Sequence, residues 1–476
     1  MDKERNNPSL ADNKMRTMKV GKLLFTMALP LAISMLVQAF YNVVDSIFVS
    51  MVSESAVTAL SLAFSVQNLQ IGFATGVAVG MNSLLSKSLG EGNRERANRA
   101  AGNGILLTLM ITVLFMLFGA FGTDAYYSMF DISRETFENG SDYTSICCLF
   151  TVGIFVEILG ERLLQASGKT IFTLFSQGTG AILNIILDPI FILGSEGMQA
   201  HFGIRLPFYV PAYGVAGTAI ATVIGQCAAA VLVIIFNLKY NTDIKFALKY
   251  LLPDGHVMGK ILTVGIPSII MMAIGSVMNL CMNQIFLSFQ DVGETASAVF
   301  GVYFKLQSFF LMPLFGINNA AISIIAYNYG ARQPGRITKT LKLSLTAAMA
   351  IMLLGLALFQ IFPDQLMSIF GADAGRENTF MSLGVSALRI VSFHFPMAAV
   401  GIALGASFQA LGNGIYSTIT SLCRQLVVLV PAAYLLSLTG DIHMVWWCFP
   451  IAEVISMITS LILFARIYKQ KVKPMM

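Results

Sequence analysis

Two acidic side chains stand inside long apolar stretches of the sequence. Asp45 closes a run that begins at Lys22, and Asp188 lies in a second such run. A carboxylate costs about 2.5–3.5 kcal/mol at the centre of a membrane helix, so an acid kept there faces a protein interior or a water-filled cavity. We therefore expect Asp45 and Asp188 to belong to one functional site.

Polar residues accompany the two acids at helical spacing. Asn184 precedes Asp188 by four residues and shares its face of the helix. Pro189 has no amide hydrogen, so it frees the backbone carbonyl of Ile185 from its helical hydrogen bond. Tyr41 lies one helical turn before Asp45 and joins the predicted site. Thr218 and Thr222, four residues apart in the span near 213–238, could add two hydroxyl groups.

This set of oxygen groups can bind either a proton or Na⁺. Two carboxylates held close together favour a shared proton, because it is costly for both to carry a charge. The amide oxygen of Asn184 between Asp45 and Asp188 would also suit Na⁺. We expect H⁺ as the coupling ion, with Na⁺ as the open alternative, and no cofactor or other metal.

The composition identifies the class of protein that holds these residues. Of 476 residues, 56% are hydrophobic and 12% are charged, and the mean hydropathy is +0.74. A soluble chain carries about 25% charged residues. The sequence therefore predicts an integral membrane protein, and the polar residues 1–19 give no sign of a signal peptide.

Twelve apolar stretches are long enough to cross a bilayer. They lie near 22–50, 56–86, 101–122, 143–167, 170–194, 213–238, 261–290, 296–329, 343–362, 379–409, 415–438 and 444–467. With both termini inside, the inner segments hold 23 Lys and Arg and the outer segments hold three. This asymmetry predicts cytoplasmic termini in the cell membrane, and it explains the net charge of +5 without a nucleic-acid partner.

Motifs of the first six spans recur in the last six. Ala28-Leu29-Pro30 returns as Gly265-Ile266-Pro267, and Gln165-Ala166-Ser167-Gly168 returns as Gln409-Ala410-Leu411-Gly412. An even number of spans per copy makes the two copies parallel. The predicted organisation is a cytoplasmic tail at 1–21, a first lobe at 22–238, a cytoplasmic linker at 239–260, a second lobe at 261–467 and a tail at 468–476.

Pro30, the stretch Tyr41–Val49, the stretch Asn184–Pro189 and the Gln165–Gly168 motif together resemble the multidrug and toxic compound extrusion (MATE) family. The resemblance covers nearly the whole chain and is strongest to the MepA-like bacterial branch. It implies an all-α membrane protein with 12 transmembrane helices in two parallel, pseudo-symmetric six-helix bundles of the MATE/MOP type. Such proteins are not enzymes and export organic cations in exchange for H⁺ or Na⁺.

The same resemblance implies roles for individual residues. Asp45 and Asp188 match the first-half acids of cation coupling, and Glu161, or else Glu157, matches a glutamate of the fourth helix. Family members that bind Na⁺ in the second half carry acids in helices seven and ten, whereas His394 stands in the tenth stretch here. We therefore expect the first lobe to couple alone.

The drug is expected between the halves, near spans one, two, seven and eight. Flexible methionines and aromatic rings adapt to varied ligands. The helix kinks are predicted at Pro30 and Pro267, and the protein is expected to act as a monomer in the lipid bilayer. The candidate substrate-binding residues are Gln38, Phe64, Asn279, Met272, Phe309 and Met312.

Three other features of the sequence are interpreted as structural. Gly72, Gly76 and Gly80 recur every four residues and would let a neighbouring helix approach closely. The adjacent Glu161-Arg162 is typical of a structural ion pair. Glu453 has no partner that the sequence identifies.

Three alternative functions make different demands on the residues of the spans and loops. A lipid-linked oligosaccharide flippase of the same superfamily stays the alternative because Lys305, Arg389 and Arg424 could meet a pyrophosphate. An intramembrane aspartyl protease needs a Gly-x-Gly-Asp turn, which Asp188 lacks. A major-facilitator transporter needs an Asp-Arg-x-Gly-Arg-type loop after span two, which the chain also lacks.

Overall fold

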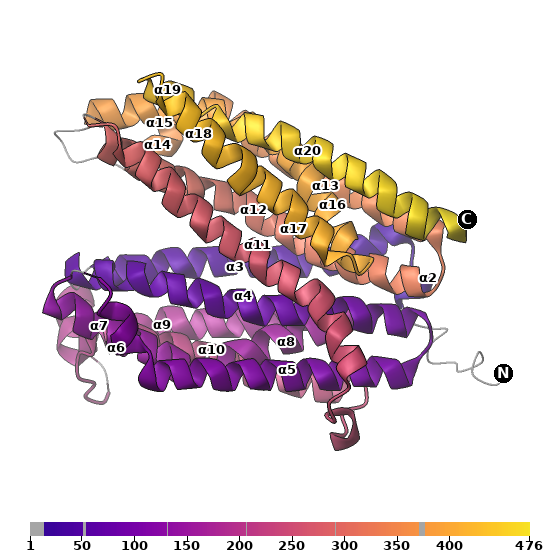
Figure 1. The fold of residues 1–476 in the computed structure, drawn as a ribbon. Coiled ribbons are helices and arrows are strands. Elements are labelled where there is room, and N and C mark those ends of the chain that lie inside the picture. Colours follow the sequence, from indigo (N-terminus) through magenta and orange to yellow (C-terminus); the bar gives the residue numbers. More distant parts are fainter. Residues whose placement is uncertain (1–13, 51–53, 131, 206, 291, 371–376) are drawn as a thin grey trace. The chain divides into compact units, whose positions relative to one another are not determined.

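The computed structural model describes residues 14–50, 54–130, 132–205, 207–290, 292–370 and 377–476. Inside the helices, the side chains of 41–43, 45–47, 49, 50, 54, 57 and 377 lie outside this description. The described residues form helices joined by short connections and include no strand (Figure 1).

The prediction of twelve membrane spans is confirmed within the described residues. Ten helices are individually long and apolar enough to cross a bilayer, and two bent pairs bring the number to twelve. The pairs are α7 (Arg134–Leu149) with α8 (Val152–Ala166), bent by 46°, and α15 (Glu377–Ser392) with α16 (Phe395–Ala410), bent by 50°. The sequence predicted each pair as a single stretch, at 143–167 and at 379–409.

The chain folds as two compact units whose borders lie inside two helices. One unit holds Ile33–Ile269, and the other holds Met1–Ala32 with Ile270–Met476. The borders fall two residues after Pro30 in α3 (Val20–Ser50) and two residues after Pro267 in α11 (Gly255–Leu287). A proline inside a helix removes one backbone hydrogen bond. In both α3 and α11, the border between the units therefore lies next to an interruption in the series of helical hydrogen bonds.

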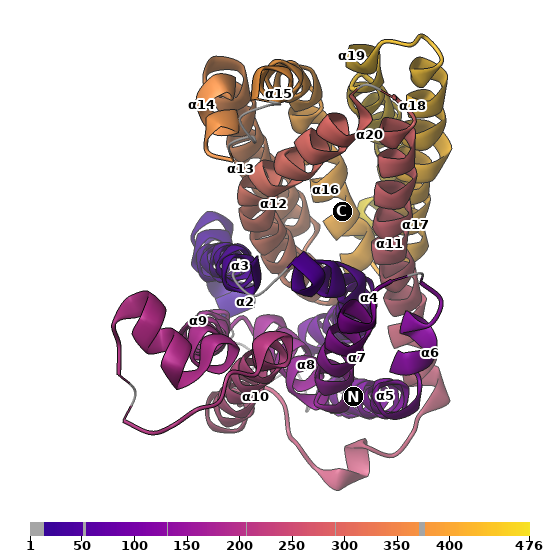
Figure 2. The ribbon, with the colours of Figure 1, turned by 90° about the vertical axis from the view of Figure 1, so that its left-hand side faces the viewer.

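The unit of Ile33–Ile269 is an antiparallel bundle whose apolar residues pack inward. Two of its clusters centre on Tyr143 with Ala219 and on Phe115 with Phe155. Besides parts of α3 and α11, its elements are α4 (Glu54–Gly90), α5 (Arg94–Phe121), α6 (Thr123–Tyr127), α7, α8, α9 (Ile171–Phe202), α10 (Gly214–Tyr240) and η1 (Leu248–Tyr250) (Figure 2).

The second unit buries a larger aromatic core. Phe286, Phe300, Tyr303 and Trp446 are all at most 2% exposed. Besides parts of α3 and α11, its elements are α2 (Lys14–Thr17), α12 (Gly293–Gly330), α13 (Pro334–Ile361), α14 (Pro363–Ser368), α15, α16, α17 (Gly414–Leu422), η2 (Cys423–Leu429), α18 (Val430–Ser437), α19 (Ile442–Val445), α20 (Cys448–Ile467), η3 (Tyr468–Val472) and η4 (Lys473–Met475).

The internal repeat of the sequence is also seen in the backbone geometry of equivalent turns in the two units. Gly168 after α8 and Gly412 after α16 both have φ +73°. Each donates its amide to the carbonyl of the repeat glutamine three residues earlier, Gln165 at 2.9 Å and Gln409 at 3.1 Å. A left-handed residue favours glycine because it has no Cβ, which is why the motif ends in glycine in both copies.

Two glycines of α4 bring it against α11, as their spacing predicted. A Cβ at Gly76 would lie 2.7 Å from the carbonyl oxygen of Gly265, and a Cβ at Gly80 would lie 2.1 Å from that of Ile261. Both distances are shorter than a van der Waals contact allows. Backbone therefore touches backbone in this helix pair, which is the small-residue packing of membrane helices.

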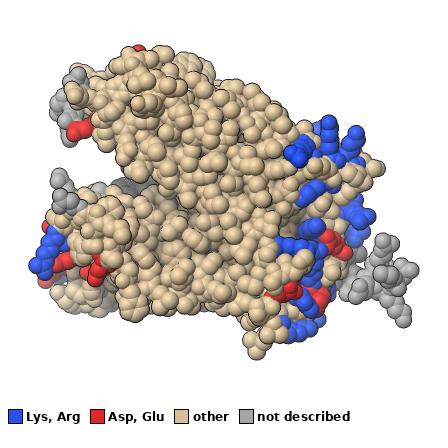
Figure 3. Space-filling view, viewed as in Figure 1, with Lys and Arg blue, Asp and Glu red and all other residues tan. Residues whose placement is uncertain are grey.

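Lys and Arg gather at one end of the helices in each unit (Figure 3). In the first unit they surround the α4–α5 turn, where Asn93 caps α5 by accepting a hydrogen bond from the amide of Arg96 at 2.9 Å. In the other unit they surround the α12–α13 turn. The residues concerned are Lys87, Arg94, Arg96 and Arg99 in the first unit and Arg332, Arg336, Lys339 and Lys342 in the second.

Candidate functional site

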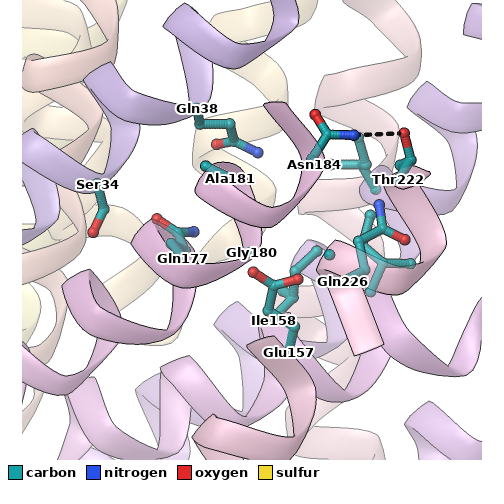
Figure 4. A pocket seen from close by; sticks show the side chains of 13 residues that line it. Ser34, Gln38, Glu157, Ile158, Gln177, Gly180, Ala181, Asn184, Thr222 and Gln226 are labelled. Atoms are coloured by element: carbon teal, nitrogen blue, oxygen red, sulfur yellow. Dashed lines mark hydrogen bonds between the residues drawn. The ribbon is translucent and has the colours of Figure 1, made fainter. Parts of the chain in front are cut away.

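Three predicted site residues are joined by hydrogen bonds between α9 and α10. The side-chain amide of Asn184 donates to Asp188 Oδ1 at 3.3 Å. It also donates to Thr222 Oγ1 at 3.3 Å, the hydrogen bond drawn in Figure 4. Asp188 is fully buried and Asn184 is 3% exposed. Their spacing of four residues puts both on one face of α9, and α10 supplies Thr222 from the facing helix.

Thr218 completes this group one turn before Thr222 on α10, and it is fully buried. Its hydroxyl and the Asn184 Oδ1 atom are buried without a hydrogen-bond partner in the described part of the chain. An unpaired buried oxygen is costly. These two atoms are therefore placed to accept a hydrogen bond from water or to contact a cation.

A cavity of about 70 Å³ adjoins the Asn184 side of this group. Ser34 Oγ and Gln177 Oε1 in its wall are also buried without a partner within the described residues. The volume admits a few water molecules or a small ion, but a drug-sized ligand needs about 300 Å³ or more. The lining residues are Ser34, Gln38, Ile71, Ile154, Glu157, Ile158, Gln177, Gly180, Ala181, Asn184, Thr222, Gly225 and Gln226.

Close packing of α9 on α10 supports the cavity. A Cβ at Gly225 would lie 2.7 Å from the carbonyl oxygen of Gly180, and one at Gly180 would lie 3.0 Å from that of Gly225. The two backbones thus approach closely one turn below the Asn184–Thr222 hydrogen bond. This approach keeps the two polar faces within hydrogen-bonding reach.

Glu157, rather than Glu161, reaches the wall of the cavity (Figure 4). Glu161 lies one turn further along α8, where Ser176 Oγ donates to it at 3.4 Å and Gln177 Nε2 donates at 3.1 Å. The expected ion pair with its neighbour is replaced by other bonds, since Arg162 donates to Gln165 Oε1 at 2.9 Å. Of the two glutamates, Glu157 is the one in contact with the cavity.

The side chains of Asp45 and Tyr41 lie outside the described residues, so their predicted place beside Asp188 stays a prediction. Gln38, from the same helix, lines the cavity. Phe64 belongs to the same unit but is 60% exposed on α4. The remaining substrate candidates, Met272, Asn279, Phe309 and Met312, belong to the other unit.

Sequence reasoning missed two amides of the cavity. Gln226 follows Thr222 by four residues, and Gln177 precedes Asn184 by seven, so each shares a helix face with a predicted residue. Extending the helical spacing by one turn after Thr222 and by two turns before Asn184 would have found both.

The second unit contains a separate buried polar cluster at the bend between α15 and α16. His394 Nε2 lies 2.8 Å from the Tyr303 hydroxyl, and its Nδ1 lies 3.9 Å from Glu453 Oε2. Arg424 Nη1 lies 3.6 Å from Glu453 Oε1. These are the partners of Glu453 that the sequence did not identify, because they come from elements distant in sequence. Lys305 and Arg389 are exposed.

Comparisons with known proteins agree with this geometry. The MatE family model matches residues 30–190 and, a second time, residues 267–435. The chain is 24% identical over 437 residues to the multidrug export protein MepA of Staphylococcus haemolyticus strain JCSC1435, covering 92% of this chain and 91% of the relative. It is 22% identical to the MepA of Staphylococcus saprophyticus, covering 93% of each.

Solved structures show the same fold. A crystal structure of MATE in complex with MaL6 superposes with a TM-score of 0.88 at 24% identity, covering 97% of this chain and 99% of that one. An outward-facing multidrug resistance MATE family transporter of the MOP superfamily also reaches 0.88, at 23% identity, covering 97% and 98%. Within the described residues, no three His, Cys, Asp or Glu side chains form a group that could hold a metal ion.

Proposed function

The chain belongs to the MatE family of multidrug and toxic compound extrusion transporters, and from that premise we propose that it exports lipophilic organic cations in exchange for protons. Proteins of this family are membrane efflux pumps, not enzymes. The relatives named multidrug export proteins support the class of substrate. Alternating access between the two membrane faces would carry the drug outward, with both termini in the cytoplasm and the protein acting as a monomer.

One observation carries the coupling proposal: a buried acid, Asp188, joined through Asn184 to a small polar cavity that Glu157 also borders. Chains of acids and water inside a membrane protein conduct protons. The cavity is large enough for water and too small for a drug. It therefore serves the coupling ion, and the proton would pass between Glu157 and Asp188 by way of water and Asn184.

A proton fits this group better than Na⁺ does. Sodium would need several oxygen ligands around one point, and among the four described candidates only Asp188 is an acid, beside the neutral Asn184, Thr218 and Thr222. A proton needs only one carboxylate with a hydrogen-bond partner, which Asp188 and Asn184 provide. Protonation would remove the charge on Asp188 and let the α9–α10 face repack, which links proton entry to a change of access.

One ion pair weighs against lipid-linked oligosaccharide flipping. Of the three cations that a pyrophosphate could have met, Arg424 is paired with Glu453. A pyrophosphate substrate would need unpaired cationic groups beside its path.

Efflux into inside-out vesicles tests both the substrate and the ion. With a fluorescent lipophilic cation outside and an acidic lumen, we expect dye to accumulate in sodium-free buffer and to stop when the pH gradient is collapsed. A lumenal Na⁺ gradient at uniform pH is expected to drive no accumulation. Accumulation only after Na⁺ is added would refute proton coupling, and no accumulation under either gradient would refute the substrate class.

Replacing Glu157 with glutamine tests the second acid of the cavity. Glu157→Gln keeps the shape and removes the charge, so we expect proton-driven efflux to fall roughly tenfold, about 1.4 kcal/mol, with dye binding unchanged. Glu196→Gln is the matched control, because Glu196 is exposed and does not line the cavity. Equal efflux in the two variants would remove Glu157 from the proton path.

A further inference from the structure

The connection between α10 and α11, residues 241–254 and here termed the linker segment, is fastened to α5. Asn98 Oδ1 accepts a hydrogen bond from the amide of Lys245 at 2.8 Å. Asn103 Oδ1 accepts one from the amide of Asp254 at 2.8 Å. Two asparagines of one helix thus hold the linker segment at two places.

Tyr250 holds the central part of the linker segment against α5. It is 7% exposed, and its hydroxyl donates to Glu95 Oε2 at 3.0 Å. A Cβ at Gly102 would lie 2.1 Å from the Tyr250 carbonyl oxygen, so the two backbones are in direct contact. Glu95 and Asp254 both pair with Arg99, at 3.4 and 3.3 Å. Arg99 therefore links Glu95 of α5 to Asp254 at the end of the linker segment.

The linker segment also bears exposed apolar side chains. Phe246, Leu248 and Leu252 are 38%, 84% and 68% exposed. Large apolar side chains that have no protein cover are stabilised by contact with lipid rather than with water. A segment that is hydrogen-bonded to a helix and carries exposed apolar side chains is typical of an element at the membrane interface.

The place of the linker segment along α5 puts it at the level of the bilayer surface. The last charge of α5 is Arg99, and residues 100–121 carry none. The segment borders Ile105, which is roughly 9 Å further along the helix at about 1.5 Å per residue. Beyond it, Leu109 and Met110 are 43% and 58% exposed and continue the apolar surface.

A groove of about 270 Å³ lies between α5 and the linker segment. Its walls are mostly apolar, which suits part of an acyl chain. Its polar lining residues are Asn98, Lys245 and Tyr250. The lining residues are Asn98, Ala101, Gly102, Ile105, Lys245, Phe246, Ala247, Leu248, Tyr250 and Leu251.

Two exposed lysines, Lys245 and Lys249, flank this groove. Lys249 Nζ lies 4.6 Å from the centroid of the Tyr250 ring, and a hydrogen bond to the Tyr250 side chain holds the pKa of Lys249 above its ordinary value. The linker segment therefore carries two exposed cations beside an apolar groove.

We propose that this groove is a binding site for an anionic glycerophospholipid of the inner leaflet. The phosphate lies between Lys245 and Lys249, and one acyl chain enters the groove along α5. The proposal rests on the cytoplasmic placement of the linker segment in the proposed function, and it concerns lipid binding rather than transport. Each lysine near an anionic surface raises affinity about fivefold, so the pair is expected to give roughly a 20-fold preference over zwitterionic lipid.

A tryptophan in place of Leu248 tests the site in the full-length protein. The chain has two tryptophans, Trp446 and Trp447, so the signal of Leu248→Trp is taken as the difference from the parent protein. In nanodiscs, bromine-labelled phosphatidylglycerol is expected to quench this signal at roughly 20-fold lower mole fraction than bromine-labelled phosphatidylcholine. Adding Lys245→Gln with Lys249→Gln is expected to abolish the preference.

The matched control removes two exposed lysines of α13, Lys339→Gln with Lys342→Gln, and is expected to keep the preference. No quenching by either lipid would place residue 248 in water and overturn the proposal. Equal quenching by both would indicate ordinary bilayer contact, and a preference that survives loss of Lys245 and Lys249 would also refute the site. Because the readout is binding, these outcomes are independent of dye efflux.

Discussion

Asp188→Asn is expected to abolish proton-driven dye efflux, to the level of vesicles without the protein, while dye binding remains. The substitution is nearly isosteric and keeps an oxygen toward Asn184 Nδ2, now 3.3 Å from Asp188 Oδ1. It removes the carboxylate that would take and release the proton. Because the Asp188 side chain is fully buried, water from the bulk solvent cannot replace the lost carboxylate as the proton acceptor. Efflux and equilibrium dye binding are measured on the same preparation.

The control for this experiment is Asp364→Asn, since Asp364 is exposed on α14 in the other unit. It is expected to leave efflux unchanged. Asp45→Asn is expected to match Asp188→Asn, as the sequence-based pairing of the two acids requires. If Asp188→Asn retains wild-type efflux at equal protein level, Asp188 has no role in coupling. If the variant loses dye binding, Asp188 belongs to the drug-binding site instead.

Gly80→Val is expected to prevent accumulation of folded protein in the membrane. The added Cβ would lie 2.1 Å from the carbonyl oxygen of Ile261, and 3.1 Å from the amide nitrogen of Gly265. These are backbone atoms, so no side chain can turn aside, and α4 must separate from α11. Gly80→Ala, with only the Cβ, is expected to cost about 1–3 kcal/mol and to lower the thermal midpoint of purified protein by several degrees.

Gly405→Ala is the matched control, because a Cβ at this helical glycine meets nothing within 4 Å. Alanine is the better helix former by about 1 kcal/mol, so the midpoint is expected to stay or rise. Fluorescence-detected gel filtration measures folded yield, and thermal unfolding in detergent measures the midpoint. If Gly80→Ala and Gly405→Ala behave alike, the close approach of α4 and α11 does not limit stability.

Local chemistry was enough to determine much of this protein from its sequence. Apolar length determined the spans, and helical spacing alone joined Asn184 to Asp188, as their hydrogen bond confirms. The repeated Gln165–Gly168 and Gln409–Gly412 motifs predicted equivalent turns, and both glycines have φ +73°. These features depend on residues within one or two helical turns, where sequence order and spatial order coincide.

Only the tertiary structure decided which glutamate of α8 reaches the cavity. Glu157 and Glu161 are one turn apart, so periodicity gives them the same face. The packing of α8 on α9 separates them, because Gln177 of α9 donates to Glu161 while Glu157 lies at the cavity wall. Likewise, Arg424 and Glu453 meet through the packing of η2 on α20. Contacts between helices depend on bend and rotation, which no single helix encodes.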